Sequence, residues 1–183
     1  MANEILYKVG TSIIVADTTD YSPTAARTLG TRTDQIDLTG VVAAAARQSA
    51  KLDFTATRAM LYDVRLNIEF ATDAAGSVDL YMSPSHSGTA NIGNVAHCTG
   101  SDAAYAAIAG HTLTELLAQL HFIGAAACSV QNTADGIQSI HIGVFSPTDR
   151  YGCLVVHNNT ADTFHSDAAE MAVGFFPIIA EVQ

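Results

Sequence analysis

Residues 60–70 read MLYDVRLNIEF, a stretch in which apolar and polar side chains alternate. The apolar side chains that share one parity are Met60, Tyr62, Val64, Leu66, Ile68 and Phe70, and the polar side chains of the other parity are Asp63, Arg65, Asn67 and Glu69. Only the period-two geometry of a β-strand places these two sets on opposite faces. At roughly 3.3 Å per residue the strand would be about 35 Å long. The stretch predicts a long strand with one face on a core.

Other segments share this character. After a turn-like run at residues 71–76, Val78, Leu80 and Met82 alternate with polar or aromatic neighbours, which predicts a hairpin partner for the first strand. Further strands are predicted within residues 121–130, 138–145, 151–157 and 171–182, and residues 5–15 are expected to form an extended arm or strand. Asn158 to Asp162 is predicted to be a loop, and Pro177 is expected to make its part of the last strand an edge or a bulge.

One helix is predicted. Thr112 and Glu115 have the spacing of a capping box, and leucines at helical spacing accompany them: Leu113, Leu116, Leu117 and Leu120. We expect this short helix to close one end of the β-structure.

The predicted fold is all-β, a jelly-roll-like antiparallel β-sandwich with one short helix and an extended N-terminal arm. Residues 16–34 and 83–103 have no period and are expected to form long loops. The predicted division is an arm or loop over residues 1–34 and a sandwich domain over residues 35–183. The absence of tryptophan argues against an immunoglobulin domain.

The composition limits the partners. Only 14% of the 183 residues are charged, against about 25% in ordinary soluble domains. Because interface cores are depleted in charge, this composition favours close-packed contacts between subunits. The net charge is −10 and the only lysines are Lys8 and Lys51, so binding to nucleic acid or to an anionic membrane is not expected. No apolar stretch predicts a transmembrane helix, and no secretory signal is expected.

Few residues of the sequence are candidates for catalysis or metal binding. Cys98, Cys128 and Cys153 are spaced for neither a disulfide framework nor a zinc site, and are predicted to be buried or half-buried free thiols. His165-Ser166-Asp167 matches the start of a facial triad, but no histidine follows it, so a loop before the last strand is the preferred interpretation.

The chain contains seven histidines, at positions 86, 97, 111, 121, 141, 157 and 165. None lies in an HExxH or Cys-x-x-Cys context, although a symmetry axis could gather copies of one histidine around a metal.

Acidic and nucleophilic residues give no enzymatic pattern. Asp63, Glu69 and Asp79 could suggest paired acids, but a solvated strand face explains Asp63 and Glu69 better. The sequence contains neither a Gly-x-Ser-x-Gly motif nor a glycine-rich phosphate loop. Accordingly, no catalytic, cofactor-binding or metal-binding residue is predicted, no cofactor is expected, and the chain is expected not to be an enzyme.

The sequence resembles a diffuse group of tailed-bacteriophage virion proteins, the jelly-roll head decoration or cement proteins. The resemblance spans residues 55–180 and is carried by MLYDVRLNIEF…SVDLYMSPS, GTANIGNVAHCTGSDAAY, LLAQLHFIGAAACS, QSIHIGVFSP and RYGCLVVHNN…HSDAAEMAVGFFPI. It implies a homotrimer that binds the major capsid protein on the outside of a phage head and stabilises the shell, after assembly in the host cytoplasm.

Two other functions are considered. One is a tail, neck or fibre component built on a similar sandwich. The other is a carbohydrate-binding module for host attachment, against which stand the low aromatic content and the dispersed tyrosines at positions 7, 21, 62, 81, 105 and 151.

Overall fold

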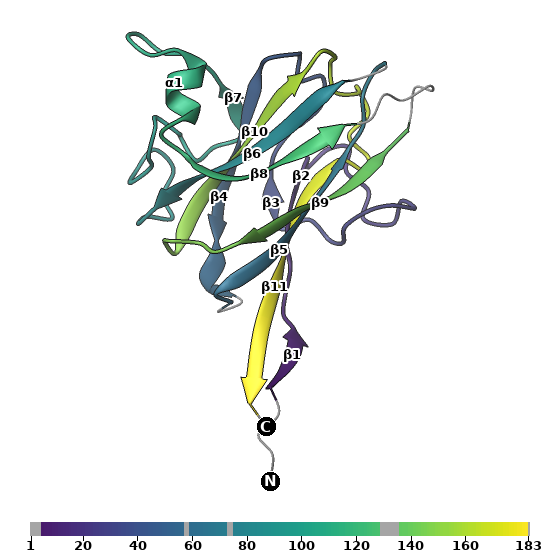
Figure 1. Cartoon of the computed structure of the whole chain (residues 1–183), viewed down its shortest axis with the longest axis vertical. Helices are drawn as coiled ribbons and strands as arrows, with labels where there is room; N and C mark the ends of the chain where they lie inside the picture. The colour runs from purple at the N-terminus through teal and green to yellow at the C-terminus, as the bar shows by residue number, and fades with distance from the viewer. Residues whose placement is uncertain (1–4, 57–58, 73–74, 129–135, 183) are drawn as a thin grey trace.

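The computed structural model describes residues 5–56, 59–72, 75–128 and 136–182 (Figure 1). Its strands are β1 (Ile5–Val9), β2 (Ile13–Ala16), β3 (Asp34–Gln35), β4 (Ala46–Asp53), β5 (Leu61–Ile68), β6 (Gly76–Ser85), β7 (Ala103–Tyr105), β8 (His121–Cys128), β9 (Gln138–Phe145), β10 (Tyr151–Thr160) and β11 (Ala172–Val182). The helices are the 3₁₀ turn η1 (Phe54–Ala56) and α1 (Leu113–Leu117).

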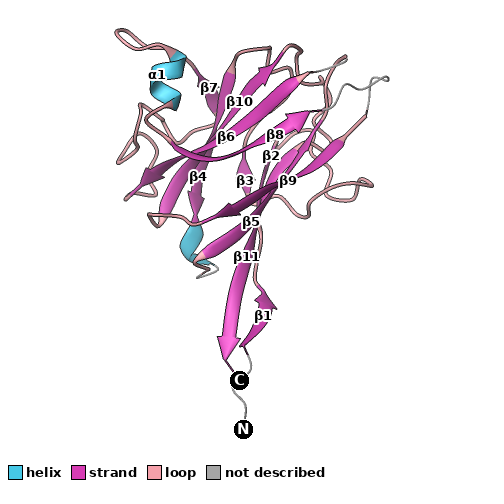
Figure 2. Cartoon of the chain, viewed as in Figure 1, coloured by secondary structure: helices cyan, strands magenta, loops and turns pink. Residues whose placement is uncertain are grey.

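The strands form two sheets that pack face to face, which confirms the predicted all-β sandwich with one short α-helix (Figure 2). Sheet A has the order β3-β2-β11-β5-β9, with β1 also paired to β11, and sheet B has the order β7-β4-β10-β6-β8. All neighbouring pairs are antiparallel except β2 and β3.

Pairing among eight of the strands, all except β1, β3 and β7, is nested. The first of them pairs with the last, β2 with β11, and the next pairs inward are β4 with β10, β5 with β9 and β6 with β8. Strands distant in sequence therefore lie side by side, and consecutive strands such as β4 and β5 belong to opposite sheets.

The alternation of residues 60–70 decides the packing of β5. Tyr62, Val64, Leu66 and Ile68 are fully buried and belong to the core between the sheets. Each buried side chain of this size contributes about 1.5–3 kcal/mol relative to an exposed one. The opposite sheet supplies core residues from alternating positions too: Val78, Leu80, Met82, Leu154 and Val156.

The polar face of β5 is only partly solvated, which corrects the sequence interpretation. Arg65 is exposed, but Asn67 and Glu69 are buried. The Asn67 amide donates a hydrogen bond to the backbone carbonyl of Arg27, so the N-terminal loop (residues 17–33) covers this end of the strand.

That loop packs on the outer face of sheet A. Its Tyr21 and Leu29 form a small apolar cluster with Ile14, Ala172 and Phe176. Strand β2, which precedes the loop, lies inside sheet A between β3 and β11. Within residues 1–34, the part from Ile13 onward is therefore integral to the sandwich and not a separate arm.

At Pro177, strand β11 has a neighbour on one side only, as the predicted edge implies, because its pairing with β2 ends at Phe175 and its pairing with β1 begins at Ile178. Pro177 pairs with Tyr62 of β5, and it coincides with the place where the other neighbour of β11 changes from β2 to β1. Gly10 fills this break, where a Cβ would lie 2.7 Å from the Pro177 ring. Beyond Pro177, β11 and β1 form a two-stranded ribbon that projects from the sandwich (Figure 1).

Helix α1 begins as predicted. Thr112 accepts a hydrogen bond from the Glu115 amide, and the Glu115 carboxylate accepts one from the Thr112 amide. Its location differs from the prediction, because Leu116 and Leu117 pack on Cys153 and Val155, which face outward from sheet B. The helix thus belongs to an outer layer (residues 86–120) that does not close an end of the sandwich. Within this layer β7 is the edge strand of sheet B, and the other residues cover that sheet.

One further prediction was wrong and one long strand was missed. Asn158 to Thr160 continue β10 instead of forming a loop, because they pair with residues 76–78 of β6. Strand β4, between β7 and β10, had no counterpart in the sequence analysis. Among the described residues, no helix is long and apolar enough to span a membrane.

Candidate functional site

The His165-Ser166-Asp167 motif is a turn before β11, as the preferred interpretation predicted. The Asp167 amide donates to His165 Nδ1 at 3.0 Å, and the Asp167 carboxylate accepts from the Ala169 amide at 2.9 Å. His165 Nδ1 also lies 3.9 Å from the Glu69 carboxylate. Local hydrogen bonds of this kind stabilise a turn and account for the residue types.

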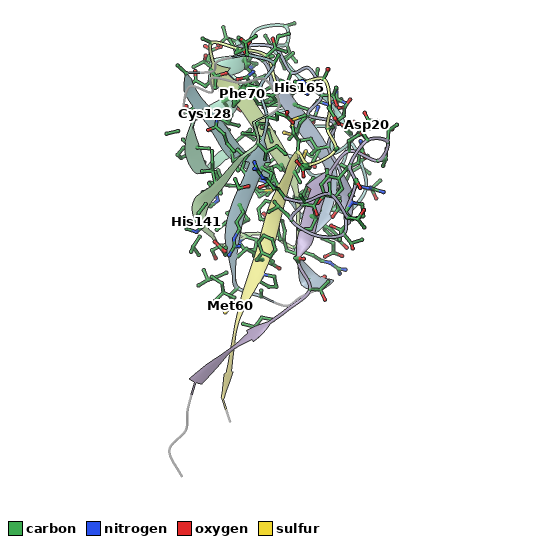
Figure 3. The ribbon with its side chains drawn as sticks, turned by 90° about the vertical axis from the view of Figure 1, so that its right-hand side faces the viewer. Asp20, Met60, Phe70, Cys128, His141 and His165 are labelled. Carbon is green, nitrogen blue, oxygen red and sulfur yellow. The ribbon has the colours of Figure 1, made fainter. Side chains whose placement is uncertain are left out.

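The histidines are scattered over the molecule. His141 lies at the β9 edge and His165 at the end remote from the ribbon (Figure 3). His121 and His141 are exposed on their strands, and the rings of His97 and His111 are 6.0 Å apart in the outer layer. Within the described ranges, no three His, Cys, Asp or Glu residues are grouped to hold a metal ion. Metal binding by histidines around a symmetry axis stays untested.

The three cysteines are free thiols, as predicted: Cys98 and Cys153 are buried and Cys128 is half-buried. Cys98 and Cys153 meet beneath the outer layer, where the hydrogen bond to Cys153, together with burial, raises the pKa of the Cys98 thiol. Burial, with a smaller effect of the Asp79 charge, raises the pKa of Cys128 to about 11.

The acidic candidates do not form a pair. Asp63 lies on the outer face of sheet A, whereas Asp79 lies on β6 in sheet B, where His157 Nδ1 is 3.6 Å from its carboxylate. Asp63 instead contacts two neighbours on the same face, with distances of 2.8 Å from its carboxylate to the Arg65 guanidinium and 2.7 Å to His141 Nε2.

The exposed surface of the outer layer is almost without charge. Between Asp79 and Glu115 the only Asp, Glu, Lys or Arg is Asp102. Three large apolar side chains of this layer are exposed: Ile92 (52%), Val95 (39%) and Ile108 (39%). Residues 106–112 are all exposed, with no charged side chain among them.

The carboxylate of Asp102 is paired with other residues of the protein. It accepts hydrogen bonds from Arg47, at 2.7 Å, and from Gln35, at 3.0 Å. Burial acts to raise the pKa of Asp102, but the hydrogen bonds from Arg47, Gln35 and the Asp37 amide outweigh it and hold the pKa below its ordinary value of 3.8. Apart from the exposed carboxylate of Glu115 in α1, the surface of the outer layer therefore presents uncharged groups to any partner.

A second feature lies on the other sheet, where a pocket of about 490 Å³ opens between the N-terminal loop, β5 and β9. We call it the β5–β9 pocket, and its lining residues are Arg27, Thr28, Leu29, Arg65, Asn67, Ser139, Ile140 and His141. It contains two of the eight lysine and arginine residues of an acidic chain.

Hydrogen bonds and ion pairs hold the charged side chains of the pocket in place. Asp63 holds both Arg65 and His141, and the Arg65 guanidinium also stacks on the Phe176 ring at 5.0 Å. Arg27 donates from Nη1 to the Ile137 carbonyl at 3.3 Å.

Neither surface was found by sequence reasoning. The pocket combines residues from segments that are about 40 and 70 positions apart in the chain, and no local motif signals such a meeting. The long interval with few charged residues can be seen in the sequence. That its residues lie together on one face can be seen only in the folded structure.

Comparison of the chain with protein-family models, with curated proteins and with solved structures finds no match in any of the three.

Proposed function

We propose that this chain is a non-enzymatic structural protein of a tailed-bacteriophage virion, a decoration or cement protein that binds the outside of the head. The observation that carries the proposal is the outer layer, an ordered surface with exposed apolar side chains and few charges. Of its two acidic residues, Asp102 is paired with Arg47 and only Glu115 is exposed. Surfaces depleted in charge and enriched in apolar groups are typical of the cores of protein interfaces.

The nested strand pairing supports a jelly roll as the finer topology. In a jelly roll one long antiparallel hairpin is wrapped so that the first strand pairs with the last and the innermost strands pair with each other. The pairs β2·β11, β4·β10, β5·β9 and β6·β8 have this relation. Viral capsid proteins are among the proteins that use the jelly roll, although a fold alone does not establish a function.

The proposed partners are the major capsid protein and two further copies of the chain in a homotrimer. A rigid sandwich with a face of low charge suits a position between neighbouring capsid subunits, and the projecting ribbon of β1 and β11 offers a second point of attachment. Because many copies bind one shell, a small stabilisation at each copy sums over the particle.

The test compares phage heads with and without the chain. Heads that lack it should release DNA at a lower temperature, and purified wild-type chain should restore the wild-type release temperature. The variant Ile108→Asp places a charge in the outer layer and should fail to restore it. The matched control Val42→Asp, at a residue that is 57% exposed outside the outer layer, should restore it.

A tail, neck or fibre component is the alternative within the same class. Fractionation distinguishes the two, because a decoration protein is found with separated heads and a tail component with isolated tails. If heads without the chain release DNA at the wild-type temperature, the decoration role is wrong.

A further inference from the structure

We propose that the β5–β9 pocket binds a small acidic saccharide, a sugar that carries a carboxylate group. This inference concerns the outer face of sheet A and is independent of the role proposed for the outer layer on sheet B. It is based on the charge of the pocket, on one buried polar atom and on the apolar part of the wall.

The charge balance of the pocket favours an anion. Asp63 forms an ion pair with Arg65 and contacts His141, so a carboxylate of the protein already compensates the charge of Arg65. Arg27 is different, because the ion pairs found among the described residues do not include it. Its one side-chain hydrogen bond there is to the Ile137 carbonyl, which leaves further guanidinium donors for a carboxylate. The nearby acid Glu170 accepts a hydrogen bond from the Arg27 amide, at 3.0 Å.

Asn67 indicates that the ligand also carries donors. The residue is 1% exposed and lines the pocket, and its Oδ1 has no hydrogen-bond partner among the described residues. A buried acceptor without a partner costs stability. Inorganic phosphate or sulfate would bring mainly acceptors, whereas the hydroxyl groups of a sugar would bring the missing donor. The side chains of Ser139 and His141 offer further polar contacts to hydroxyl groups.

The remaining wall suits the apolar face of a sugar ring. Leu29 and Ile140 line the pocket, and Phe176 lies beneath the Arg65 guanidinium. A volume of about 490 Å³ is within the range of small-molecule sites, which is roughly 300–1,000 Å³. The scarcity of clustered aromatic rings argues against stacking of neutral sugars, and recognition here depends on charge and hydrogen bonds instead.

The experiment is calorimetric titration of the full-length chain with galacturonate and with N-acetylneuraminate. Galactose serves as the neutral probe and inorganic phosphate as the simple anion. At least one of the two acids should bind saturably, and galactose and phosphate should each bind about tenfold more weakly or worse.

Two arginine variants locate the binding. Arg27→Ala removes a guanidinium that makes one contact in the described structure and should weaken binding of the acidic sugar by about tenfold or more. Arg32→Ala removes the same charge from the same loop but outside the pocket, and should leave the affinity within about twofold of wild type. Thermal unfolding of each variant verifies that it is folded.

Three results would overturn the inference. Absence of saturable binding by either acid would exclude the ligand class. Equal binding of phosphate would mean that the pocket recognises charge alone. Equal weakening by Arg27→Ala and Arg32→Ala would mean that the interaction is with the overall charge of the loop.

Discussion

Arg47 on β4 donates a 2.7 Å hydrogen bond from Nε to Oδ1 of Asp102, the only Asp, Glu, Lys or Arg between Asp79 and Glu115. The bond joins the outer layer to sheet B beside Gln35, which also donates to Asp102. It therefore has two effects: it anchors the layer, and it compensates one of the layer's two acidic charges, the other being the exposed Glu115.

The first prediction concerns this bond. Asp102→Asn should lower the free energy of unfolding at pH 7 by about 1.5–3 kcal/mol, the range for hydrogen bonds to charged groups. Because the folded-state pKa of Asp102 is lowered, its contribution is fully present above the unfolded pKa, ordinarily 3.8, and is lost as the pH falls through the folded pKa below it. Urea titrations of both proteins from pH 7 to pH 2.5 measure the difference. A difference that persists undiminished at pH 2.5 would contradict the assignment.

The longest strand that sequence reasoning missed, β4, is explained by the same outer layer. A strand with one face in water shows alternation, but β4 is covered on both sides over part of its length. Its Gln48 and Ser49 are both buried, and each accepts a hydrogen bond, from the Thr99 amide and the Leu154 amide respectively. Without a polar face in contact with water, the sequence ARQSAKLD has no period-two signal.

The elements that could be predicted from the sequence are those whose signal lies within a few neighbouring residues. Residues 61–68 and 138–142 were predictable because the apolar side chains of each lie mainly at one parity. The register of β9 shifts between His141 and Gly143, so Val144, which the alternation places with Ile140 and Ile142, is 56% exposed, and Phe145 is buried instead. The capping box of Thr112 and Glu115 was predictable because both residues lie in one turn. The β5–β9 pocket was not, since Arg27, Arg65 and His141 meet only through the nested pairing of the sheets.

The second prediction tests the helix cap. Thr112→Ala should lower the free energy of unfolding by about 1 kcal/mol, because the Glu115 amide loses its acceptor. Thr114→Ala is the control, since Thr114 is exposed inside the helix and alanine is the better helix former there. Chemical denaturation measures both, and equal destabilisation by the two substitutions would contradict the capping role.

The third prediction concerns Cys128. Because its pKa is raised to about 11, a rise of about two pH units from the ordinary value of 9.0, its reaction with iodoacetamide at pH 8 should be roughly a hundredfold slower than that of an exposed cysteine. The rate should increase about tenfold per pH unit up to about pH 10, as the thiolate forms. Mass spectrometry of the labelled protein measures it, with Cys128→Ser as the control for labelling of Cys98 and Cys153. Rapid modification of Cys128 at pH 8 would be inconsistent with its burial.

The fourth prediction compares the two cores that share β10. Leu154 faces the interior between the sheets and Leu116 faces sheet B from the outer layer, and both are fully buried. Truncation to alanine should cost about 2–5 kcal/mol at either site. The affected regions should differ, because Leu154→Ala removes contacts from the core of the sandwich, whereas Leu116→Ala removes contacts mainly from the layer that covers it.

Hydrogen exchange resolves this difference. In Leu154→Ala, amides of β5, β6 and β10 should exchange faster, as expected when the whole sandwich loses stability. In Leu116→Ala, acceleration should be confined to residues 86–120, and those strand amides should keep the wild-type rate. If Leu116→Ala accelerates exchange throughout the sandwich, the outer layer is inseparable from the main core. It would then be a structural element that the sandwich requires, and an uncharged surface on it would need no partner to explain its retention.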